Sequence, residues 1–128
     1  MKNNKRYSES LEDYLETIYM YGGKDVKSVD IAKHLNVSRA SVNNALNSLI
    51  DKGLVTKELY GNIALTDTGL EVSKKILEKH EILKEFLIDI LKVKPEQAET
   101  EACGIEHVIS DYTASKIKRL MKKLKNEK

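Results

Sequence analysis

Apolar residues recur at intervals of three and four along most of the chain, which is the spacing of an amphipathic helix. Leu11, Leu15 and Ile18, for example, share one face of the first such segment. The pattern predicts helices over residues 8–21, 28–35, 38–52, 66–91 and 95–109, and a last one that Ser110 and Asp111 cap and that runs into the C-terminal tail. Between residues 54 and 65 apolar and polar positions alternate instead, which predicts two strands, 54–59 and 62–65, joined at Tyr60, Gly61 and Asn62. We therefore expect a mainly α-helical fold with a small β-hairpin.

Capping residues support the second and third of these helices. Ser28 and Ser38 are candidate N-caps, because a serine hydroxyl can accept a hydrogen bond from an amide of the first turn. Gly53 is the stop signal of the third helix, since glycine tolerates the left-handed conformation that ends many helices. A short helix, a tight turn at Asn36 and Val37, a capped helix and a hairpin, in that order, predict a winged helix-turn-helix.

The 38–52 helix and the hairpin carry the side chains that we expect to face DNA. On the helix, Val42, Leu46 and Leu49 belong to an inner face, and Asn44 points the other way, as does Asp51, which we expect to face away from DNA. Asparagine amides can pair with base edges, while serine and arginine near a helix start can reach phosphates or guanine. The expected contacts are Ser38, Arg39, Ala40, Ser41, Asn43, Asn44 and Asn47 on the helix, and Lys57, Tyr60 and Asn62 on the hairpin. A helical hairpin with a merely solvated polar face is the alternative, but the ordered combination of elements favours DNA binding.

Length and composition restrict the class of protein. The chain has 128 residues, enough for one compact domain or a small domain with a helical appendage. We expect no membrane segment, because its apolar runs fall short of the roughly 18 residues of a membrane span. One cysteine excludes an intrachain disulfide framework and fits a reducing compartment, so we expect a cytoplasmic protein.

The net charge of +2 is unevenly distributed. Residues 1–6 contain three basic residues and no acidic one, and residues 116–128 contain seven basic residues against Glu127. Residues 95–115 contain no lysine or arginine but five acidic residues. Basic ends around an acidic middle suggest a polyanionic partner and a cation bound inside, although solvated helix faces would also give this pattern.

Three segments place potential metal ligands on helical faces. Asp13 and Glu16 are three residues apart on the first helix, and His80 lies within the apolar stripe of the 66–91 helix. Alone, the first two would be ordinary exposed carboxylates and the third a core histidine. On the 95–109 helix, Cys103, Glu106 and His107 share a stripe with Glu99, and a thiolate, a carboxylate and an imidazole at this spacing can bind one ion.

The motifs LEDYLETIYMY (11–21), KHEILKEFL (79–87) and EACGIEHVIS (101–110), together with the helix-turn-helix and wing, closely resemble the DtxR/MntR family of metal-dependent transcriptional regulators over about residues 8–125. The resemblance implies a winged helix-turn-helix DNA-binding domain over residues 1–70 and a helical metal-binding and dimerisation domain over residues 71–128. It further implies a homodimeric repressor of metal-ion homeostasis that binds palindromic, double-stranded operator DNA when Mn²⁺ or Fe²⁺ is bound, with one or two ions per subunit.

Carried over by position, the resemblance implies a metal site made of Asp13, Glu16, His80, Cys103, Glu106 and His107. The manganese branch of the family has a carboxylate pair matching Asp13 and Glu16, but another carboxylate at Cys103. The iron branch matches Cys103, Glu106 and His107, but generally has methionine at Asp13. Its ancillary site also has glutamate at Lys84 and histidine at Glu99. The chain therefore combines features of both branches, and we expect Mn²⁺ as the effector, with Fe²⁺ as the alternative.

Two other functions compete with this interpretation. A winged-helix regulator that senses a small organic ligand, without metal, would make the Cys103 cluster incidental. A metallohydrolase would need an open coordination position. Because nearly every donor would be used as a ligand and the sequence has no glycine-rich or nucleophile motif, we expect the protein not to be an enzyme.

Overall fold

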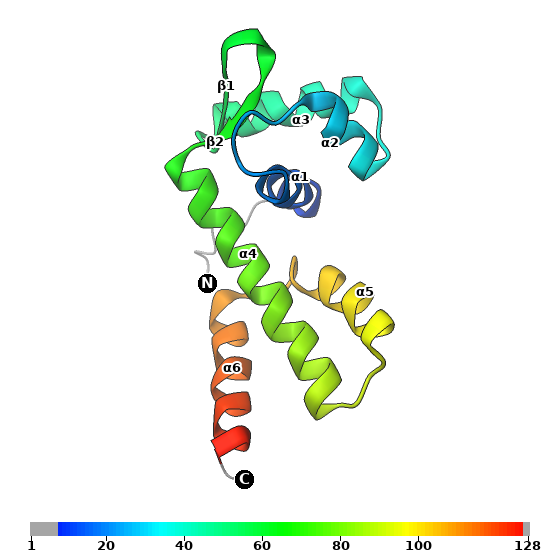
Figure 1. Ribbon diagram of the computed structural model, residues 1–128. Coiled ribbons are helices and arrows are strands. Elements are labelled where there is room, and N and C mark those ends of the chain that lie inside the picture. The colour runs from blue at the N-terminus through cyan, green and yellow to red at the C-terminus, as the bar shows by residue number, and fades with distance from the viewer. Residues whose placement is uncertain (1–7, 127–128) are drawn as a thin grey trace. The chain divides into compact units, whose positions relative to one another are not determined.

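The structure, a computed structural model, describes residues 8–126, which form two compact units, residues 8–75 and 76–126. The basic segment 1–6 and the end of the basic tail, residues 127 and 128, lie outside the described residues. In chain order the elements are α1 (Glu9–Met20), α2 (Ser28–Leu35), α3 (Arg39–Asp51), β1 (Val55–Lys57), the 3₁₀ turn η1 (Leu59–Gly61), β2 (Ile63–Leu65), α4 (Asp67–Glu85), the π-helical turn η2 (Phe86–Ile90), α5 (Pro95–Ile105) and α6 (Asp111–Asn126) (Figure 1). The fold is mainly α-helical with one antiparallel hairpin, as predicted.

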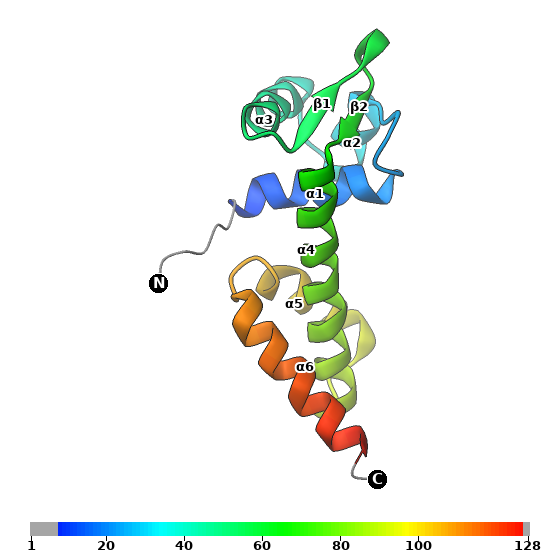
Figure 2. The same cartoon turned by 90° about the vertical axis from the view of Figure 1, so that its left-hand side faces the viewer.

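The N-terminal unit is a winged helix-turn-helix. Helices α1, α2 and α3 contact one another, and the hairpin packs on α1 through β2 and on α3 through β1 (Figure 2). The residues that are buried between them are apolar and come from every element, as shown by Leu15, Ile18, Ile31, Val42, Leu46, Leu49, Leu54 and Ile63. The inner face predicted for the 38–52 helix is confirmed, with Val42, Leu46 and Leu49 as its buried residues.

Of the three residues predicted to begin or end α2 and α3, Ser38 and Gly53 do so and Ser28 does not. The Oγ atom of Ser38 accepts a hydrogen bond of 3.0 Å from the amide of Ser41, so Ser38 caps α3. Gly53, just after α3, has a φ of +75°, the left-handed conformation expected of a stop signal. The prediction for Ser28 is wrong, because Lys27 occupies the N-cap position of α2 and Ser28 is already helical.

The hairpin is shorter than predicted. Strand β1 pairs with β2 from Val55, opposite Leu65, to Lys57, opposite Ile63. Beyond this point the chain turns through η1, where Tyr60 takes a φ of +64°, and the backbone no longer keeps strand geometry. The Tyr60 side chain is 93% exposed, so the tip of the hairpin presents it to solvent.

The first turn of α4 packs directly on the segment that joins α3 to the hairpin. The hydroxyl of Thr66 donates to the carbonyl oxygen of Gly53 at 2.7 Å and accepts from the amide of Gly69 at 3.0 Å. The amide of Thr66 also donates to the carbonyl oxygen of Leu54 at 3.0 Å. Helix α4 therefore begins where the sequence predicted, and these bonds join its start to the wing.

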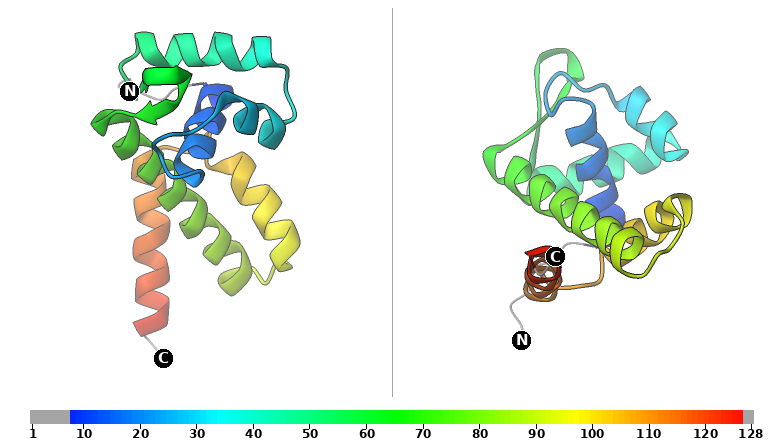
Figure 3. Two further views of the ribbon diagram at one scale, coloured as in Figure 1. Left: turned by 45° about the horizontal axis from the view of Figure 1, so that its top comes forward. Right: turned by 60° about the horizontal axis from the view of Figure 1, so that its bottom comes forward.

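The C-terminal unit is built from the rest of α4 with η2, α5 and α6 (Figure 3). Leu83, Leu87, Ala98 and Ala102 form its core, so the small residues of α5 pack against the apolar stripe of α4 and η2. Helix α6 is joined to α4 by ion pairs. Lys118 Nζ lies 3.3 Å from Glu78 Oε2, and Lys125 pairs with Glu85, so part of the positive charge of the tail is compensated within this unit.

Helix α5 ends at Ile105, four residues before the predicted end. Glu106 is its C-cap, and the backbone then forms a turn in which the amides of Val108 and Ile109 donate to the carbonyl oxygen of Ile105. The turn redirects the chain into α6, whose first turn is capped by Ser110 through a bond of 3.0 Å from the Thr113 amide. Within residues 8–126, no helix is both long and apolar enough to cross a membrane.

Candidate metal centre

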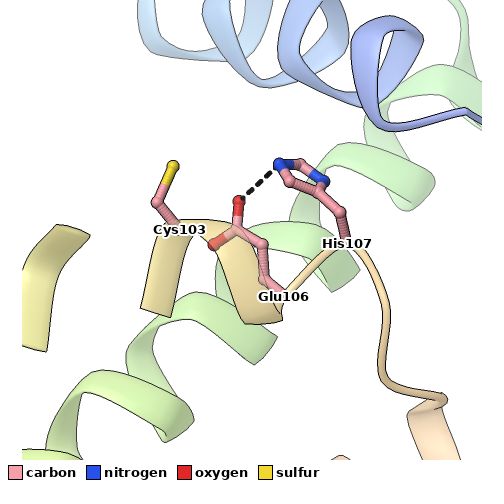
Figure 4. Close-up of side chains that lie close together, drawn as sticks. All are labelled: Cys103, Glu106 and His107. Atoms are coloured by element: carbon pink, nitrogen blue, oxygen red, sulfur yellow. Dashed lines mark ion pairs between the residues drawn. The ribbon is translucent and has the colours of Figure 1, made fainter. Parts of the chain in front are cut away.

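Three potential ligands meet where α5 ends. One donor atom each of Cys103, Glu106 and His107 can be chosen so that all three lie within 4.8 Å of one another (Figure 4). Cys103 and Glu106 are neighbours across the last turn of the helix because residues three apart share a helical face. His107 joins them from the turn that follows the helix. The spacing of one helical turn therefore brings the three side chains together at the C-terminal end of α5.

Glu106 is the central residue of the cluster. Its side chain is fully buried, yet its two oxygens face two imidazoles. Oε1 lies 2.6 Å from Nδ1 of His80, and Oε2 lies 3.4 Å from Nε2 of His107. A buried carboxylate is costly unless a charge or a hydrogen bond compensates it. His80 provides a hydrogen bond to Oε1, and the imidazole of His107 lies beside Oε2.

His80 connects the cluster to α4. It is buried, as a core histidine would be, but both of its ring nitrogens face carboxylates. Nε2 lies 3.1 Å from the carboxylate of Glu99 on α5, and Glu99 in turn lies 3.0 Å from Nζ of Lys84, one turn further along α4. The hydrogen bond from Lys84, and then that from His80, hold the pKa of the Glu99 carboxyl below its ordinary value. Glu99 in turn raises the pKa of Lys84.

Lys79 fixes the turn that carries His107. Its side chain is largely buried, and Nζ donates to the carbonyl oxygen of Ile109 at 3.2 Å. The same ammonium lies 3.3 Å from Oδ1 of Asp111. One lysine of α4 thus holds the C-terminal end of the segment between α5 and α6, beginning two residues beyond His107.

The remaining predicted ligands, Asp13 and Glu16, lie about one turn apart on α1 in the N-terminal unit, and both are half-buried. The structure brings together four of the six predicted ligands, His80, Cys103, Glu106 and His107, within the C-terminal unit. The participation of Asp13 and Glu16 stays a prediction.

The four clustered residues fit a divalent transition metal. Imidazoles are ligands for manganese, iron and zinc alike, a carboxylate suits harder ions, and a thiolate favours softer ones. Three of the four side chains are buried, which limits competition from solvent for a bound cation. Among the described residues, this cluster has the chemistry of a metal centre.

The side chains predicted to face DNA are accessible. Arg39, Ala40, Ser41, Asn43, Asn44 and Asn47 are exposed along one side of α3, Lys57 and Tyr60 are exposed on the hairpin, and Asn62 is half-buried. Ser38 is exposed too, but its hydroxyl caps α3 and donates to Ser41 Oγ at 3.0 Å. Exposure is the geometry that a recognition helix and a wing require, whereas the contacts themselves stay predicted.

Sequence reasoning missed the supporting roles of Lys79, Lys84 and Glu99. A signal was present for two of them. His80 and Lys84 are four residues apart on one helix, and Glu99 and Cys103 are four apart on another, so each pair shares a face. Lys79 gave no such signal, because its bonds are to a backbone carbonyl and a carboxylate 30 and more residues away.

Comparison with known proteins identifies the family. The family model described as the iron dependent repressor N-terminal DNA binding domain matches residues 6–63, and the iron dependent repressor metal binding and dimerisation domain matches residues 66–128. The chain belongs to the iron-dependent repressor family. Members of this family are metal-dependent transcriptional regulators with a DNA-binding and a dimerisation domain, and this membership does not favour the organic-ligand alternative.

Individual relatives agree with the family assignment. An uncharacterised HTH-type transcriptional regulator of Methanocaldococcus jannaschii is 39% identical over 123 residues, covering 94% of this chain and 98% of the relative. The transcriptional regulator MntR of Escherichia coli O6:H1 is 33% identical over 107 residues, covering 82% of this chain and 68% of the relative. The solved structure of the manganese regulator SloR is 25% identical, with a TM-score of 0.77 over 95% of this chain. This chain spans only about half of that regulator, 55% of its length.

Proposed function

We propose that this protein is a homodimeric, metal-dependent transcriptional repressor of metal-ion homeostasis that acts in the cytoplasm. The observation that carries the proposal is the convergence of His80, Cys103, Glu106 and His107 in a chain whose other unit is a winged helix-turn-helix. We propose residues 1–70 as the DNA-binding domain and residues 71–128 as the metal-binding and dimerisation domain. A regulator, rather than an enzyme, fits a cluster in which every donor serves as a ligand.

We propose that Asp13 and Glu16 complete the ligand set, as the family resemblance implies. The full set then contains up to four anionic groups, the three carboxylates and the thiolate of Cys103. A divalent ion supplies the positive charge that offsets the repulsion among them when they are brought together. Because α1 belongs to the DNA-binding unit, ligands on α1 would couple the metal to the orientation of the recognition helix.

Mn²⁺ is the effector that we propose, with Fe²⁺ as the alternative and one or two ions per subunit. Asp13, Glu16 and Glu106 are hard oxygen donors that suit Mn²⁺, whereas the thiolate of Cys103 favours Fe²⁺ or Zn²⁺. Zn²⁺ binds most such sites more tightly than Mn²⁺, so affinity alone does not select manganese. We expect Zn²⁺ to bind but to activate poorly, because tetrahedral coordination does not use the full ligand set.

Recovery of DNA by the protein in the presence of each metal tests this function. Genomic fragments are incubated with the purified chain and Mn²⁺, Fe²⁺ under anaerobic conditions, Zn²⁺ or a chelator, and bound fragments are sequenced. We expect Mn²⁺ to enrich a palindromic sequence and the chelator to enrich none. Enrichment with Fe²⁺ but not with Mn²⁺ would reverse the metal assignment, and equal enrichment in the chelator would reject metal dependence.

Substitutions on α3 test the proposed DNA contacts. We expect Arg39→Ala and Asn44→Ala each to weaken operator binding by roughly 1–3 kcal/mol, the free energy of one good base contact. Metal affinity should not change, because both residues lie on the exposed side of α3. Fluorescence anisotropy with labelled operator measures the first quantity. Lys94→Ala, which removes one exposed positive charge from the start of α5, is the control for Arg39→Ala. Unchanged operator affinity in both α3 variants would show that the assigned recognition face is wrong.

Dimerisation is expected because a two-fold dimer presents two recognition helices to successive faces of the major groove. The family model for residues 66–128 includes a dimerisation domain, and we propose that α1 and the helices after Pro95 form the interface. Sedimentation velocity at micromolar concentration should give the mass of two chains, of 14.5 kDa each. A single-chain mass with and without metal would contradict the proposed mode of DNA binding.

A further inference from the structure

A continuous series of polar contacts links α4 and α5 through Lys84, Glu99 and His80. Nζ of Lys84 lies 3.0 Å from Oε1 of Glu99. Each oxygen of Glu99 lies 3.1 Å from Nε2 of His80. This series runs from the solvent inward. The side chain of Lys84 is 35% exposed and that of Glu99 is 53% exposed, whereas that of His80 is only 8% exposed. Glu99 therefore links a surface ammonium to a buried imidazole.

The two ring nitrogens of His80 face different surroundings. Nδ1 lies 2.6 Å from Oε1 of Glu106, on the side of the ring where Cys103 and His107 gather around the same carboxylate. Nε2 faces Glu99, on the other side. A neutral imidazole that binds an ion presents a lone pair from one nitrogen and carries its hydrogen on the other. The nitrogen that keeps the hydrogen is decided by the partner that accepts from it.

Glu106 approaches His80 more closely than Glu99 does, at 2.6 Å against 3.1 Å, but the two carboxylates have different further partners. Glu106 is one of the clustered donors, so its oxygens are themselves candidate ligands. Glu99 is instead held from its outer side by the ammonium of Lys84, which contributes a fixed positive charge beside the carboxylate. An ionised carboxylate only accepts hydrogen bonds, so Glu99 can face Nε2 only as the acceptor of an N–H group.

We propose that Glu99 is a positioning residue of the metal centre, held by Lys84, which keeps the hydrogen of His80 on Nε2 and so presents Nδ1 as the ligand atom. The proposal rests on the function proposed above and adds two residues to the site. Glu99 and Lys84 are not ligands in this arrangement. They act through the imidazole, by fixing its orientation and its tautomer.

Metal affinity of matched variants gives the first test, with Zn²⁺ as a diamagnetic probe. Glu99→Ala should lower Zn²⁺ affinity by about 10- to 100-fold, the usual effect of removing a carboxylate behind a ligating histidine. Lys84→Met should lower it less, because Glu99 remains. Glu101→Ala is the control, since Glu101 lies on the same helix, is exposed, and bonds to Gln97 rather than to the cluster. Circular dichroism confirms that each variant is folded.

The tautomer of His80 gives a second readout that a general loss of stability would not change. In the Zn²⁺-loaded wild type, long-range ¹H–¹⁵N spectra should show the hydrogen of His80 on Nε2 and the metal on Nδ1. A hydrogen on Nδ1, or a Glu99→Ala variant that binds Zn²⁺ as tightly as the wild type, would overturn the positioning role alone. A wild type that binds neither Zn²⁺ nor Mn²⁺ would overturn this role together with the proposed function.

Discussion

Glu106→Gln is expected to reduce Mn²⁺ affinity by about 100- to 4,000-fold. Glu106 is fully buried, and its carboxylate lies between the imidazoles of His80 and His107. Removing one charged partner from a buried group of ion pairs costs about 3–5 kcal/mol. A change of 1.4 kcal/mol corresponds to a factor of ten in affinity. Glutamine keeps the volume of the side chain but not its charge. Competition for Mn²⁺ against a fluorescent chelator measures the change.

Glu101→Gln is the matched control, because it makes the same chemical change on an exposed face of the same helix. It should leave Mn²⁺ affinity as in the wild type. If Glu106→Gln also bound Mn²⁺ with wild-type affinity, the cluster at the end of α5 would not be the metal centre.

Gly69→Ala is expected to destabilise the N-terminal unit by about 1–3 kcal/mol or more, the cost of overpacking a well-packed site. A Cβ atom at Gly69 would lie 2.0 Å from the carbonyl oxygen of Leu54, so α4 would have to move away from the wing. Such a movement would also strain the bonds of Thr66 to Gly53 and Leu54. Helix propensity alone predicts the opposite sign, because alanine stabilises a helix by about 1 kcal/mol relative to glycine. Urea unfolding followed by circular dichroism measures the change in the free energy of unfolding.

Gly104→Ala provides the comparison, since a Cβ atom there meets nothing within 4 Å and Gly104 is helical. This variant should be stabilised by roughly 0.5–1 kcal/mol. If the two variants were stabilised alike, the close approach of α4 to Leu54 would not exist in solution.

The helix-turn-helix could be predicted from the sequence because its signals are local. Ser38 bonds to an amide three residues away, and Gly53 needs only its own left-handed conformation. The buried face of α3 follows from the spacing of Val42, Leu46 and Leu49. Such features depend on residues that are close in sequence, so a pattern of side chains is enough to indicate them.

The prediction errors occur at the ends of helices and strands, where the pattern of side chains does not decide the backbone. Helix α5 ends at Ile105, directly after Gly104, and the bonds of Lys79 to Ile109 and Asp111 hold the end of the segment that follows. The hairpin is shorter than its alternating pattern, because the strands cover only Val55–Lys57 and Ile63–Leu65 and the predicted strand residue Leu59 belongs to η1. Ser28 has the chemistry of a cap, but α2 begins one position too early for it to act as one.

The candidate metal centre was likewise predictable only where its residues are close in sequence. Cys103, Glu106 and His107 were predicted from their spacing, because one helical turn places them together. His80 needed the packing of α4 against α5, which the sequence supplied only through the family resemblance. The contact between Lys84 and Glu99 joins residues on two helices, and no local pattern pairs them. Asp13 and Glu16 remain predicted ligands.

The affinity for purified operator DNA, measured in a chelator and again in saturating Mn²⁺, tests the central claim most directly. A metal that couples to DNA binding should raise the affinity by roughly 5- to 150-fold, the usual range of such coupling. We expect this rise for the wild type and its loss in Glu106→Gln. Equal operator affinity in the chelator, in Mn²⁺ and in anaerobic Fe²⁺ would contradict it.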